Sequence, residues 1–387
     1  MRTSSSVGVK AFSVYARTSW VGSPGLGPGK PVSRPYHGPV KPRGKHQDQA
    51  KAAISIQDVA DAANVSIATV SRVLNNPEVV SAATAAKVRE VIDRLRYVPN
   101  PFAQGLITRE SRVLCFALPD MFGEFYSELI RGADAKAHQL GYHLLVSSEA
   151  RGTPQSPNAA KNGLGLGLAD GLAVMITEPG ALAWRETGDH NIPVVLIDVQ
   201  VDQPGVDCVL VDNAVGTTQA VKHLLETTAP DKVYFVGGPA ENFDTSARAA
   251  AFAAALREAG HEPRPDQVSF GRYDLAWGSQ WFSTRLDATK RRGIAVLAAN
   301  DEIALGVLHA AEDAAMSVPG DLKLVGFDDT RLASLVRPKL SSVRVPLTEV
   351  GGAAISLLAE RIDDPDRPSH CVRLETQLVV RESSGGR

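Results

Sequence analysis

Long apolar runs and paired cysteines are missing from the 387-residue sequence, and each absence excludes a class of protein. No stretch is long and apolar enough to span a membrane, and no signal-peptide pattern opens the chain. We therefore expect a cytoplasmic protein without a membrane partner. Its three cysteines, Cys115, Cys208 and Cys371, lie far apart in apolar surroundings. Packing explains them better than bridging does, and we expect no disulfide.

Catalytic motifs are missing as well. The sequence has no G-x-S-x-G elbow and no H-E-x-x-H pattern, and its nine histidines show no metal-ligand spacing. We expect no enzyme activity, no catalytic residues, no metal site and no cofactor. An enzyme built on an α/β core remains a distant alternative.

Residues 1–53 differ in composition from the rest of the chain. They are rich in Gly, Pro and Ser, and nine Lys or Arg stand against one acidic residue, Asp48, which gives +8 in a chain of net charge -2. Such a segment buries too little apolar surface to order itself, so we expect a disordered basic extension. It is either an inert extension, which we favour, or a basic arm that contacts DNA phosphates.

A short helix with two different faces is predicted within residues 65–76, VSIATVSRVLNN. Ser66 can cap its first turn, and Val70, Val73 and Leu74 recur on one side as core residues do. The other side carries small or hydrogen-bonding groups, which leave a DNA base edge within reach. The predicted DNA-binding residues are Ser66, Ile67, Ala68, Thr69, Ser71, Arg72, Asn75 and Asn76.

Amphipathic patterns on both sides complete a three-helix headpiece. The first helix ends before Asn64, a residue type that tolerates the left-handed backbone of a tight turn, and Ser81 can cap the third. Apolar residues recur at helical spacing in both helices: Ile56, Val59, Ala60 and Ala63 in the first, and Val88, Val91, Ile92 and Leu95 in the third. This arrangement is typical of a helix-turn-helix domain. The pattern alone leaves open a helical hairpin with no DNA role.

Residues 56–106 resemble, without a gap, the DNA-binding headpiece of the lactose-repressor (LacI/GalR) family. The resemblance rests on DVADAANVSIATVSRVLNNPEVVSAATAAKVREVIDRLRYVPNPFAQGL and departs from it at Asn64, where many members have Gly. It implies that Ile67 and Ala68 set operator preference. Pro101 suits the first turn of a further short helix. By resemblance this is the hinge helix, whose Leu106 wedges into the minor groove; the alternative is that Leu106 packs on the core.

From Arg112 onward, short apolar runs alternate with amphipathic helices, which indicates parallel sheets covered on both faces and a cleft at their strand ends. The resemblance extends over nearly all of 112–383. It implies a periplasmic-binding-protein-like core of two subdomains crossed three times, roughly 112–209 with 345–368 and 210–344 with 369–387. The predicted class is α/β: an all-α helix-turn-helix headpiece with a hinge helix, then a two-subdomain core. The domains are 1–53, 54–111 and 112–387.

Polar residues close several apolar runs, where α/β proteins bind ligands. Carboxylates and amides at strand ends can accept from several hydroxyls, as a sugar or nucleoside site requires. By resemblance the effector-binding residues are Asp198, Arg248, Asn300 and Asp328, with Tyr273 placed to stack on a sugar face and Phe125 as a further aromatic. Helix capping is the alternative for each carboxylate; we expect it for Asp301 and leave it open for Asp329.

These features predict a transcriptional regulator, a repressor, that binds double-stranded DNA at a pseudo-palindromic operator. A small sugar-like or nucleoside-like effector switches it. Because no leucine-heptad tail follows the core, we expect a homodimer. We expect it in the cytoplasm, associated with the nucleoid. The alternative is a cytoplasmic sugar-binding protein without DNA binding.

Overall fold

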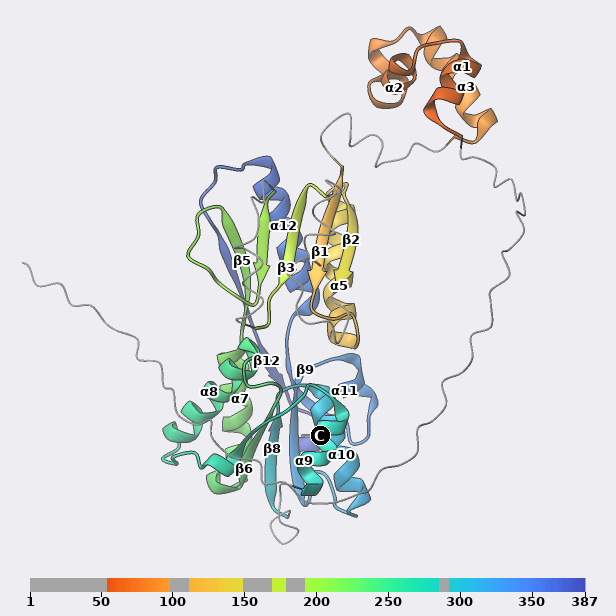
Figure 1. Ribbon diagram of the computed structural model, residues 1–387. Coiled ribbons are helices and arrows are strands. Elements are labelled where there is room, and N and C mark those ends of the chain that lie inside the picture. Colours follow the sequence, from red (N-terminus) through yellow and green to blue (C-terminus); the bar gives the residue numbers. More distant parts are fainter. Residues whose placement is uncertain (1–53, 98–110, 149–168, 179–191, 285–291, 387) are drawn as a thin grey trace, which may run out of the picture. The chain divides into compact units, whose positions relative to one another are not determined.

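A computed structural model describes residues 54–97, 111–148, 169–178, 192–284 and 292–386 (Figure 1). The predicted basic extension and the predicted hinge helix with Leu106 lie outside the described residues. The described chain forms a small helical headpiece and a core with two sheets. The predicted α/β class is confirmed for these parts. Within them, no helix is long and apolar enough to cross a membrane.

The headpiece consists of α1 (Ile56–Ala63), α2 (Ile67–Asn75), a 3-10 turn (Pro77–Val79) and α3 (Ala82–Leu95). The predicted caps are confirmed: the Ser66 hydroxyl accepts from the Thr69 N–H at 3.2 Å, and the Ser81 hydroxyl from the Thr84 N–H at 3.3 Å. Asn64 has a φ of 52°, as its turn requires. The buried core of the headpiece consists of Val59, Ala60, Ala63, Val70, Val73, Ala85, Val88 and Val91.

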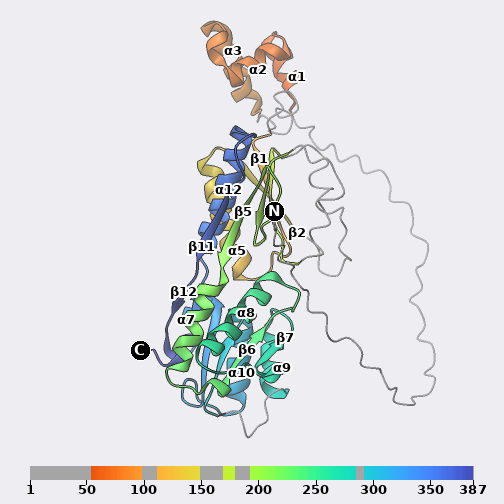
Figure 2. The same cartoon turned by 90° about the vertical axis from the view of Figure 1, so that its left-hand side faces the viewer.

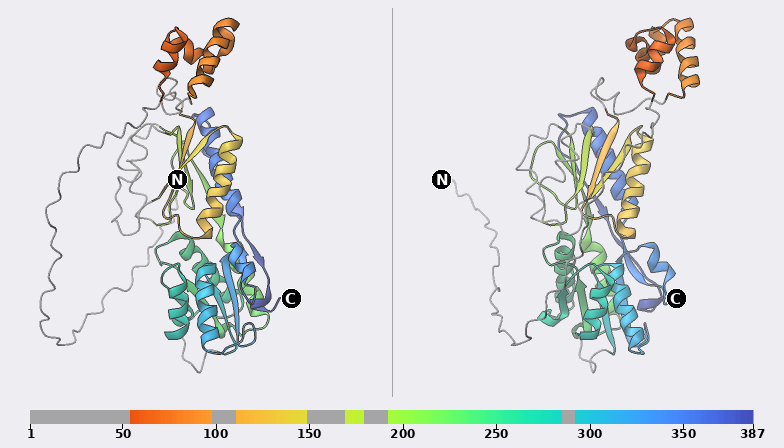
Figure 3. Two further views of the ribbon diagram at one scale, coloured as in Figure 1. Left: turned by 90° about the vertical axis from the view of Figure 1, so that its right-hand side faces the viewer. Right: turned by 45° about the vertical axis from the view of Figure 1, so that its right-hand side comes forward.

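In the first sheet of the core, all five pairs of neighbouring strands are parallel. Its strand order is β11 (Cys371–Glu375), β5 (Val206–Asp212), β4 (Val194–Ile197), β3 (Gly171–Met175), β1 (Val113–Leu118) and β2 (His143–Ser148). The helices α5 (Glu124–Gln139) and α12 (Leu347–Asp363) lie side by side against it (Figure 3).

Two glycines allow α5 and α12 to approach closely. A Cβ on Gly132 would lie 2.0 Å from the Thr348 carbonyl oxygen, and one on Gly351 would lie 2.1 Å from that of Leu129. Both atoms are backbone, so the helices cannot yield to a larger residue without separating. This contact fixes the start of α5, and with it Phe125 and Tyr126, relative to the sheet.

The second sheet is parallel apart from its edge strand β12, which runs antiparallel to β10. Its order is β12 (Gln377–Val379), β10 (Ser341–Arg344), β9 (Leu322–Asp328), β8 (Ile294–Ala298), β6 (Val233–Gly237) and β7 (Val268–Phe270). The helices around it are α7 (Asn213–Leu225), α8 (Phe243–Glu258), α9 (Leu275–Thr284), α10 (Asp301–Asp313) and α11 (Arg331–Leu335). Short 3-10 turns span Pro230–Lys232, Pro265–Gln267 and Glu382–Ser384.

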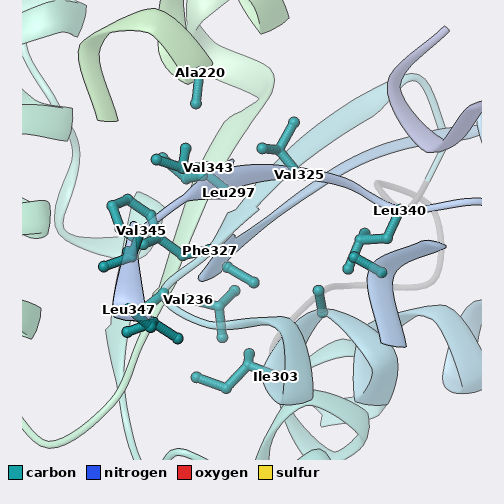
Figure 4. Packing of buried hydrophobic residues seen from close by; sticks show 14 of the residues in the cluster. Ala220, Val236, Leu297, Ile303, Val325, Phe327, Leu340, Val343, Val345 and Leu347 are labelled. Carbon is teal, nitrogen blue, oxygen red and sulfur yellow. The ribbon is translucent and has the colours of Figure 1, made fainter. Parts of the chain in front are cut away.

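The core of the second sheet consists of closely packed apolar side chains. Figure 4 shows Val236 of β6, Leu297 of β8, Phe327 of β9 and Ile303 of α10 among its packed side chains, and each is fully buried. Adjacent central strands of this kind read as continuous apolar runs, because both faces are covered. The ring of Phe327 also packs against the Arg248 guanidinium, which belongs to the polar cluster described below.

The chain crosses between the sheets three times: from β5 into α7, from β10 into α12, and from β11 into β12 (Figure 2). Thr376, between β11 and β12, accepts from the Gly216 N–H at 2.9 Å and donates to the Asp212 carbonyl at 2.7 Å. A Cβ on Gly216 would lie 2.2 Å from Val343 of β10. All three crossings therefore meet at Gly216. The predicted three crossings are confirmed, but β5 extends to Asp212 and β11 belongs to the first sheet, so the predicted boundaries at 209 and 369 were wrong.

The prediction of no disulfide was wrong. Cys208 of β5 and Cys371 of β11 are register partners on neighbouring strands, with their Cα atoms 4.5 Å apart, and they form a disulfide that spans 163 residues of sequence. Wide separation in sequence says nothing about strand register, which brings these residues together. Cys115 remains free and buried, and burial raises the pKa of its thiol to about 11.

Alkylation with iodoacetamide should count these cysteines. For protein purified without reductant, we expect no adduct in the native state, one after unfolding in denaturant, and three after unfolding with reductant, because only Cys115 is unbridged and its thiol is buried and protonated. Intact-mass spectrometry reads the number of adducts. Three adducts without reductant would contradict the bridge.

A buried ion cluster lies next to the disulfide. The fully buried carboxylate of Asp207 accepts from the guanidinium of Arg361 at 2.9 and 3.1 Å, from Arg367 at 2.7 Å, and from the His370 N–H at 2.7 Å. It thus ties the end of α12 and the start of β11 to β5. The sequence patterns gave no indication of this cluster, since its members are about 150 residues apart.

Candidate DNA-reading helix and effector cleft

The helix α2 buries one face and exposes the other. Val70 and Val73 are buried in the headpiece core, whereas Ile67 is 40% exposed and Ala68 and Arg72 are exposed. The guanidinium of Arg72 has no hydrogen-bond or ion-pair partner among the described residues. The face therefore offers a guanidinium, a methyl and a small apolar chain, the groups that match base edges in a major groove.

The remaining predicted DNA-binding residues are more constrained. Ser66 and Thr69 form the cap, with their hydroxyl oxygens 2.9 Å apart, so their side chains are partly committed to the helix end. Ser71 is half-buried and Asn76 is exposed. Asn75 ends α2, and its side chain lies outside the described residues.

In the core, strand order predicts where a cleft forms. In the second sheet β6 lies between β7 and β8, so the chain adds β7 on one side of β6 and β8 on the other. Ligands bind at such switch points of strand order, at the carboxyl ends of the strands. Gly237 ends β6 and leads towards α8, while Ala298 ends β8. In the first sheet, Asp198 follows β4. These ends carry the residues of the cluster that we call the cleft cluster: Asp198, Asn213, Asp244, Arg248 and Asp328.

Arg248 is the centre of the cleft cluster. It lies on α8, is 3% exposed, and has its guanidinium carbon 3.7 Å from the centroid of the Phe327 ring. Its Nε donates to Asn213 Oδ1 at 2.8 Å, and its Nη1 donates to the Ala299 carbonyl oxygen. Asn213 in turn donates to Asp244 Oδ1 at 2.7 Å. The guanidinium is thus held by Asn213 of α7, by the backbone that follows β8, and by Phe327 of β9.

Three carboxylates face this one cation. Oxygens of Asp244 and Asp328 each lie 3.8 Å from Arg248 nitrogens, which is ion-pair distance but too long for a hydrogen bond. Burial raises the pKa of Asp328 to about 7; Arg248 lowers it, and Asp244 and Glu302 raise it. Burial also raises the pKa of Asp198 well above its usual range, with further increases from Asp244 and Asp328 and only a partial offset from Arg248.

Both strand-end aspartates have an unusual backbone. Asp198 has a φ of 68° and Asp328 a φ of 97°, values that L-residues with a side chain rarely adopt. Strained backbone of this kind persists only where surrounding structure imposes it, and it clusters at ligand sites. One of these residues follows a strand of the first sheet, and the other ends a strand of the second.

The predicted aromatic residues occupy different environments. Tyr273 is half-buried, and its hydroxyl lies 2.6 Å from Thr245 Oγ1 and donates to Asn242 Oδ1 at 3.1 Å, so the ring is fixed against the start of α8. Phe125 packs edge-on against Tyr126 with 5.1 Å between centroids. Burial, and to a smaller extent the charges of Asp120 and Asp198, raise the pKa of Tyr126.

The N-cap of α10 is Asn300 and not its neighbour Asp301. The Oδ1 of Asn300 accepts from the Ile303 N–H at 2.8 Å. Asn300 directly follows Ala299, whose carbonyl accepts from Arg248. The prediction that Asp301 caps α10 is therefore wrong. Asp301 is buried and accepts from the Thr330 N–H at 2.8 Å and Ser342 Oγ at 2.6 Å, and its pKa rises to about 8, mainly through burial. Asp329 does not cap α11 either, since Thr330 is its N-cap; Asp329 pairs with Arg344 and Arg381.

Sequence reasoning missed Asn213 and Asp244. Asp244 precedes Arg248 by four residues on α8, the spacing of an acid–base pair on one helix face, so it was detectable. Nothing in the sequence marks Asn213, the first residue of α7. No group of three or more His, Cys, Asp or Glu side chains that could hold a metal ion occurs in the described ranges.

A headpiece with an exposed, capped helix, and a two-sheet core whose strand ends bring aspartates around one buried arginine, are the parts expected of a ligand-responsive DNA-binding regulator. Residues 55–100 match the model for bacterial regulatory proteins of the lacI family, and residues 221–384 match that for a periplasmic binding protein-like domain. Catabolite control protein A of Priestia megaterium is 31% identical over 331 residues, which is 86% of this chain and 99% of that protein. The chain belongs to the LacI family of transcriptional regulators, and its relatives are regulators and not enzymes.

Other similar proteins are transcriptional regulators as well. Catabolite control protein A of Staphylococcus xylosus is 33% identical over 337 residues, with 85% of this chain and 98% of that protein covered. The structure of the Lac repressor dimer bound to operator and the anti-inducer ONPF is similar, with a TM-score of 0.75, 26% identity, and coverage of 85% of this chain and 98% of the repressor chain. The CelR–cellobiose complex gives a TM-score of 0.63 at 26% identity, with 85% of this chain and 99% of CelR covered.

Proposed function

We propose that this protein is a repressor that binds a pseudo-palindromic operator as a homodimer and is controlled by a small sugar-like or nucleoside-like effector bound at the cleft cluster. It acts in the cytoplasm, at the nucleoid. The exposed face of α2 reads the major groove, and Leu106 is the proposed minor-groove wedge. The observation that carries the proposal is that strained aspartates from both sheets, Asp198 and Asp328, converge on one immobilised guanidinium.

That convergence suits an effector rather than a structural role. A buried acceptor left without a hydrogen-bond partner costs about 1–3 kcal/mol. Asp328 Oδ1 is buried without a hydrogen-bond partner. A ligand with several hydroxyls would satisfy it and would bridge the two subdomains. Similar solved structures support this use of the fold, since one is a complex of CelR with cellobiose and another is the Lac repressor dimer bound to operator and the anti-inducer ONPF.

A thermal-shift screen of sugars and nucleosides, followed by a gel shift on the protein's own promoter DNA, tests the proposal. A ligand at 100 times its Kd should stabilise the protein by about 2.7 kcal/mol and should change operator affinity. A protein that binds its promoter but responds to no ligand would contradict the proposed control.

We expect Arg72→Ala to weaken operator binding by about 1–3 kcal/mol while non-specific binding changes little. The reason is that a bidentate Arg–guanine pair discriminates between bases, and the Arg72 guanidinium is exposed on α2 for such a pair. Fluorescence anisotropy with operator and scrambled DNA measures both affinities. The matched control is Arg94→Ala, an exposed arginine on α3, which should leave their ratio unchanged. An equal loss on both DNAs for Arg72→Ala would make Arg72 a phosphate contact.

A further inference from the structure

The Cys208–Cys371 disulfide joins two segments that leave the first sheet for the second. β5 continues into α7, and β11 continues through Thr376 into β12. β11 is an edge strand of the first sheet, where it pairs with β5. The bridge therefore links two of the three crossings by a covalent bond.

β11 is attached to β5 on both faces of the sheet, since successive side chains of a strand point to opposite faces. On the face that α12 covers, Asp207 accepts from the His370 N–H and from the guanidinium of Arg361. On the other face, Cys208 packs in a separate apolar cluster and is bonded to Cys371. Reduction removes the second attachment and keeps the first, so β11 loosens locally while the sheet stays folded.

The two sulfurs differ in accessibility. Cys208 is 4% exposed, whereas Cys371 is half-buried, so an attacking thiol reaches the bridge at Cys371. Arg373 is exposed two residues further on β11, hence on the same face, and a nearby cation favours the thiolate. Cys115 takes no part, because three strand spacings, about 14 Å, separate β1 from β5. The pair thus has two states, bridged and reduced.

Thiol chemistry interconverts these states. A thiolate of glutathione attacks Cys371 Sγ, the S–S bond breaks, and the Cys208 sulfur leaves and takes up a proton. A second glutathione thiolate attacks the glutathione sulfur of this mixed disulfide, which releases glutathione disulfide and the Cys371 thiolate, and that thiolate takes up a proton. In the reverse direction, hydrogen peroxide oxidises the Cys371 thiol to a sulfenic acid and becomes one water; the Cys208 thiol then displaces a second water and restores the bridge.

We propose that Cys208 and Cys371 form a reversible redox switch, in which oxidation joins two crossings and strengthens operator binding. A regulator that binds the chromosome works among reduced thiols, where disulfides are usually transient and redox-sensing. With β5 and β11 joined, the core has less conformational freedom to lose when the protein is held on operator, so the bridged form binds more tightly. The DNA-binding output rests on the proposed function.

Equilibration of the full chain with mixtures of reduced and oxidised glutathione tests reversibility. Native alkylation with iodoacetamide and peptide mapping should find an adduct on Cys371 in reducing mixtures, none in oxidising mixtures, and none on the buried Cys115 in either. Backbone hydrogen exchange should become faster in β11 on reduction and stay unchanged in β8. A bridge that persists in excess reduced glutathione would be a static structural bond and would overturn the proposal.

Fluorescence anisotropy with the protein's own promoter DNA measures the output. We expect the bridged form to bind about five-fold or more tightly than the reduced form, the lower end of typical coupling between two sites. Linkage then requires bound promoter DNA to raise, by the same factor, the value of [GSH]²/[GSSG] at which half of the protein is bridged.

Two variants connect the output to the bridge. Cys371→Ser cannot form the bridge, so it should bind promoter DNA like the reduced parent and should not respond to hydrogen peroxide. Cys115→Ala is the matched control, because it keeps the bridge and should respond like the parent. The parent can be prepared in both states, so its comparison does not depend on the folding of either variant.

Equal affinity of the bridged and reduced parent for promoter DNA, or a peroxide response retained in Cys371→Ser, would overturn the switch alone. Failure of both states to bind promoter DNA would overturn the proposed function, and the switch with it.

Discussion

Arg248→Ala is expected to abolish the response of operator binding to the effector. In the described part of the chain, the guanidinium is the cation that acts on Asp198, Asp244 and Asp328, and its truncation removes a buried, charged partner from the ligand. Loss of one partner of a buried hydrogen-bonded charge pair typically costs about 2–5 kcal/mol, or roughly 30-fold to several thousand-fold in Kd. Calorimetry with the effector and anisotropy with labelled operator measure the two quantities separately.

Operator binding itself should survive in this variant. The headpiece core and the clusters in the two sheets share no residue, so damage at Arg248 does not remove packing from α1, α2 or α3. Arg257→Ala is the matched control, because Arg257 lies on the same helix with its side chain 55% exposed. It should change neither affinity. Since Arg248 also binds Asn213 and Ala299, Asp328→Asn serves as a second variant that retains these contacts and should also weaken effector binding. Equal effector affinity for parent and variants would remove these residues from the site.

Asp207→Ala is expected to destabilise the core by about 3–5 kcal/mol, a fall in Tm of roughly 6–20 °C. The carboxylate is fully buried and is the acceptor for the guanidinium groups of Arg361 and Arg367. Without it, the buried Arg361 and the partly buried Arg367 lose their counter-charge, and β11 and α12 lose a shared attachment to β5. Thermal and urea unfolding followed by circular dichroism measure the effect.

The control for this prediction lies in the preceding loop. Asp202 is an exposed carboxylate five residues earlier, and Asp202→Ala should change stability by less than about 0.5 kcal/mol. A parent-like Tm for Asp207→Ala would show that the cluster adds nothing to stability, as is found for some buried ion pairs replaced as a whole.

The headpiece was predictable because its determinants are local. Ser66 and Ser81 cap helices through N–H groups three residues away, and Asn64 adopts its left-handed turn from its own side-chain chemistry. Amphipathic spacing over a few turns gave the buried residues Val70 and Val73. In the core, the apolar runs predicted the strands and the aspartates at their ends. They did not predict that β11 belongs to the first sheet and β12 to the second.

The errors arose where pairing is non-local. The Cys208–Cys371 bridge depends on the register of strands that the sequence separates by 163 residues. Asn300 and Asp301 are adjacent and both polar, so the sequence could not tell which of them caps α10; the decision depends on Thr330 and Ser342, which hold the Asp301 carboxylate. Asn213 joins the cluster through the packing of α7 against α8, where it contacts Asp244 and Arg248, about 30 residues further along the chain.

The central claim is that a ligand in the cleft cluster controls the affinity of α2 for operator DNA. Its most direct test is the operator Kd by fluorescence anisotropy, with and without a ligand that calorimetry shows to bind, together with the ligand Kd with and without operator. Linkage requires the two ratios to be equal, and we predict a common factor of about 5–150. A ligand whose binding is lost in Arg248→Ala, but which leaves the operator Kd of the parent protein unchanged, would contradict the account.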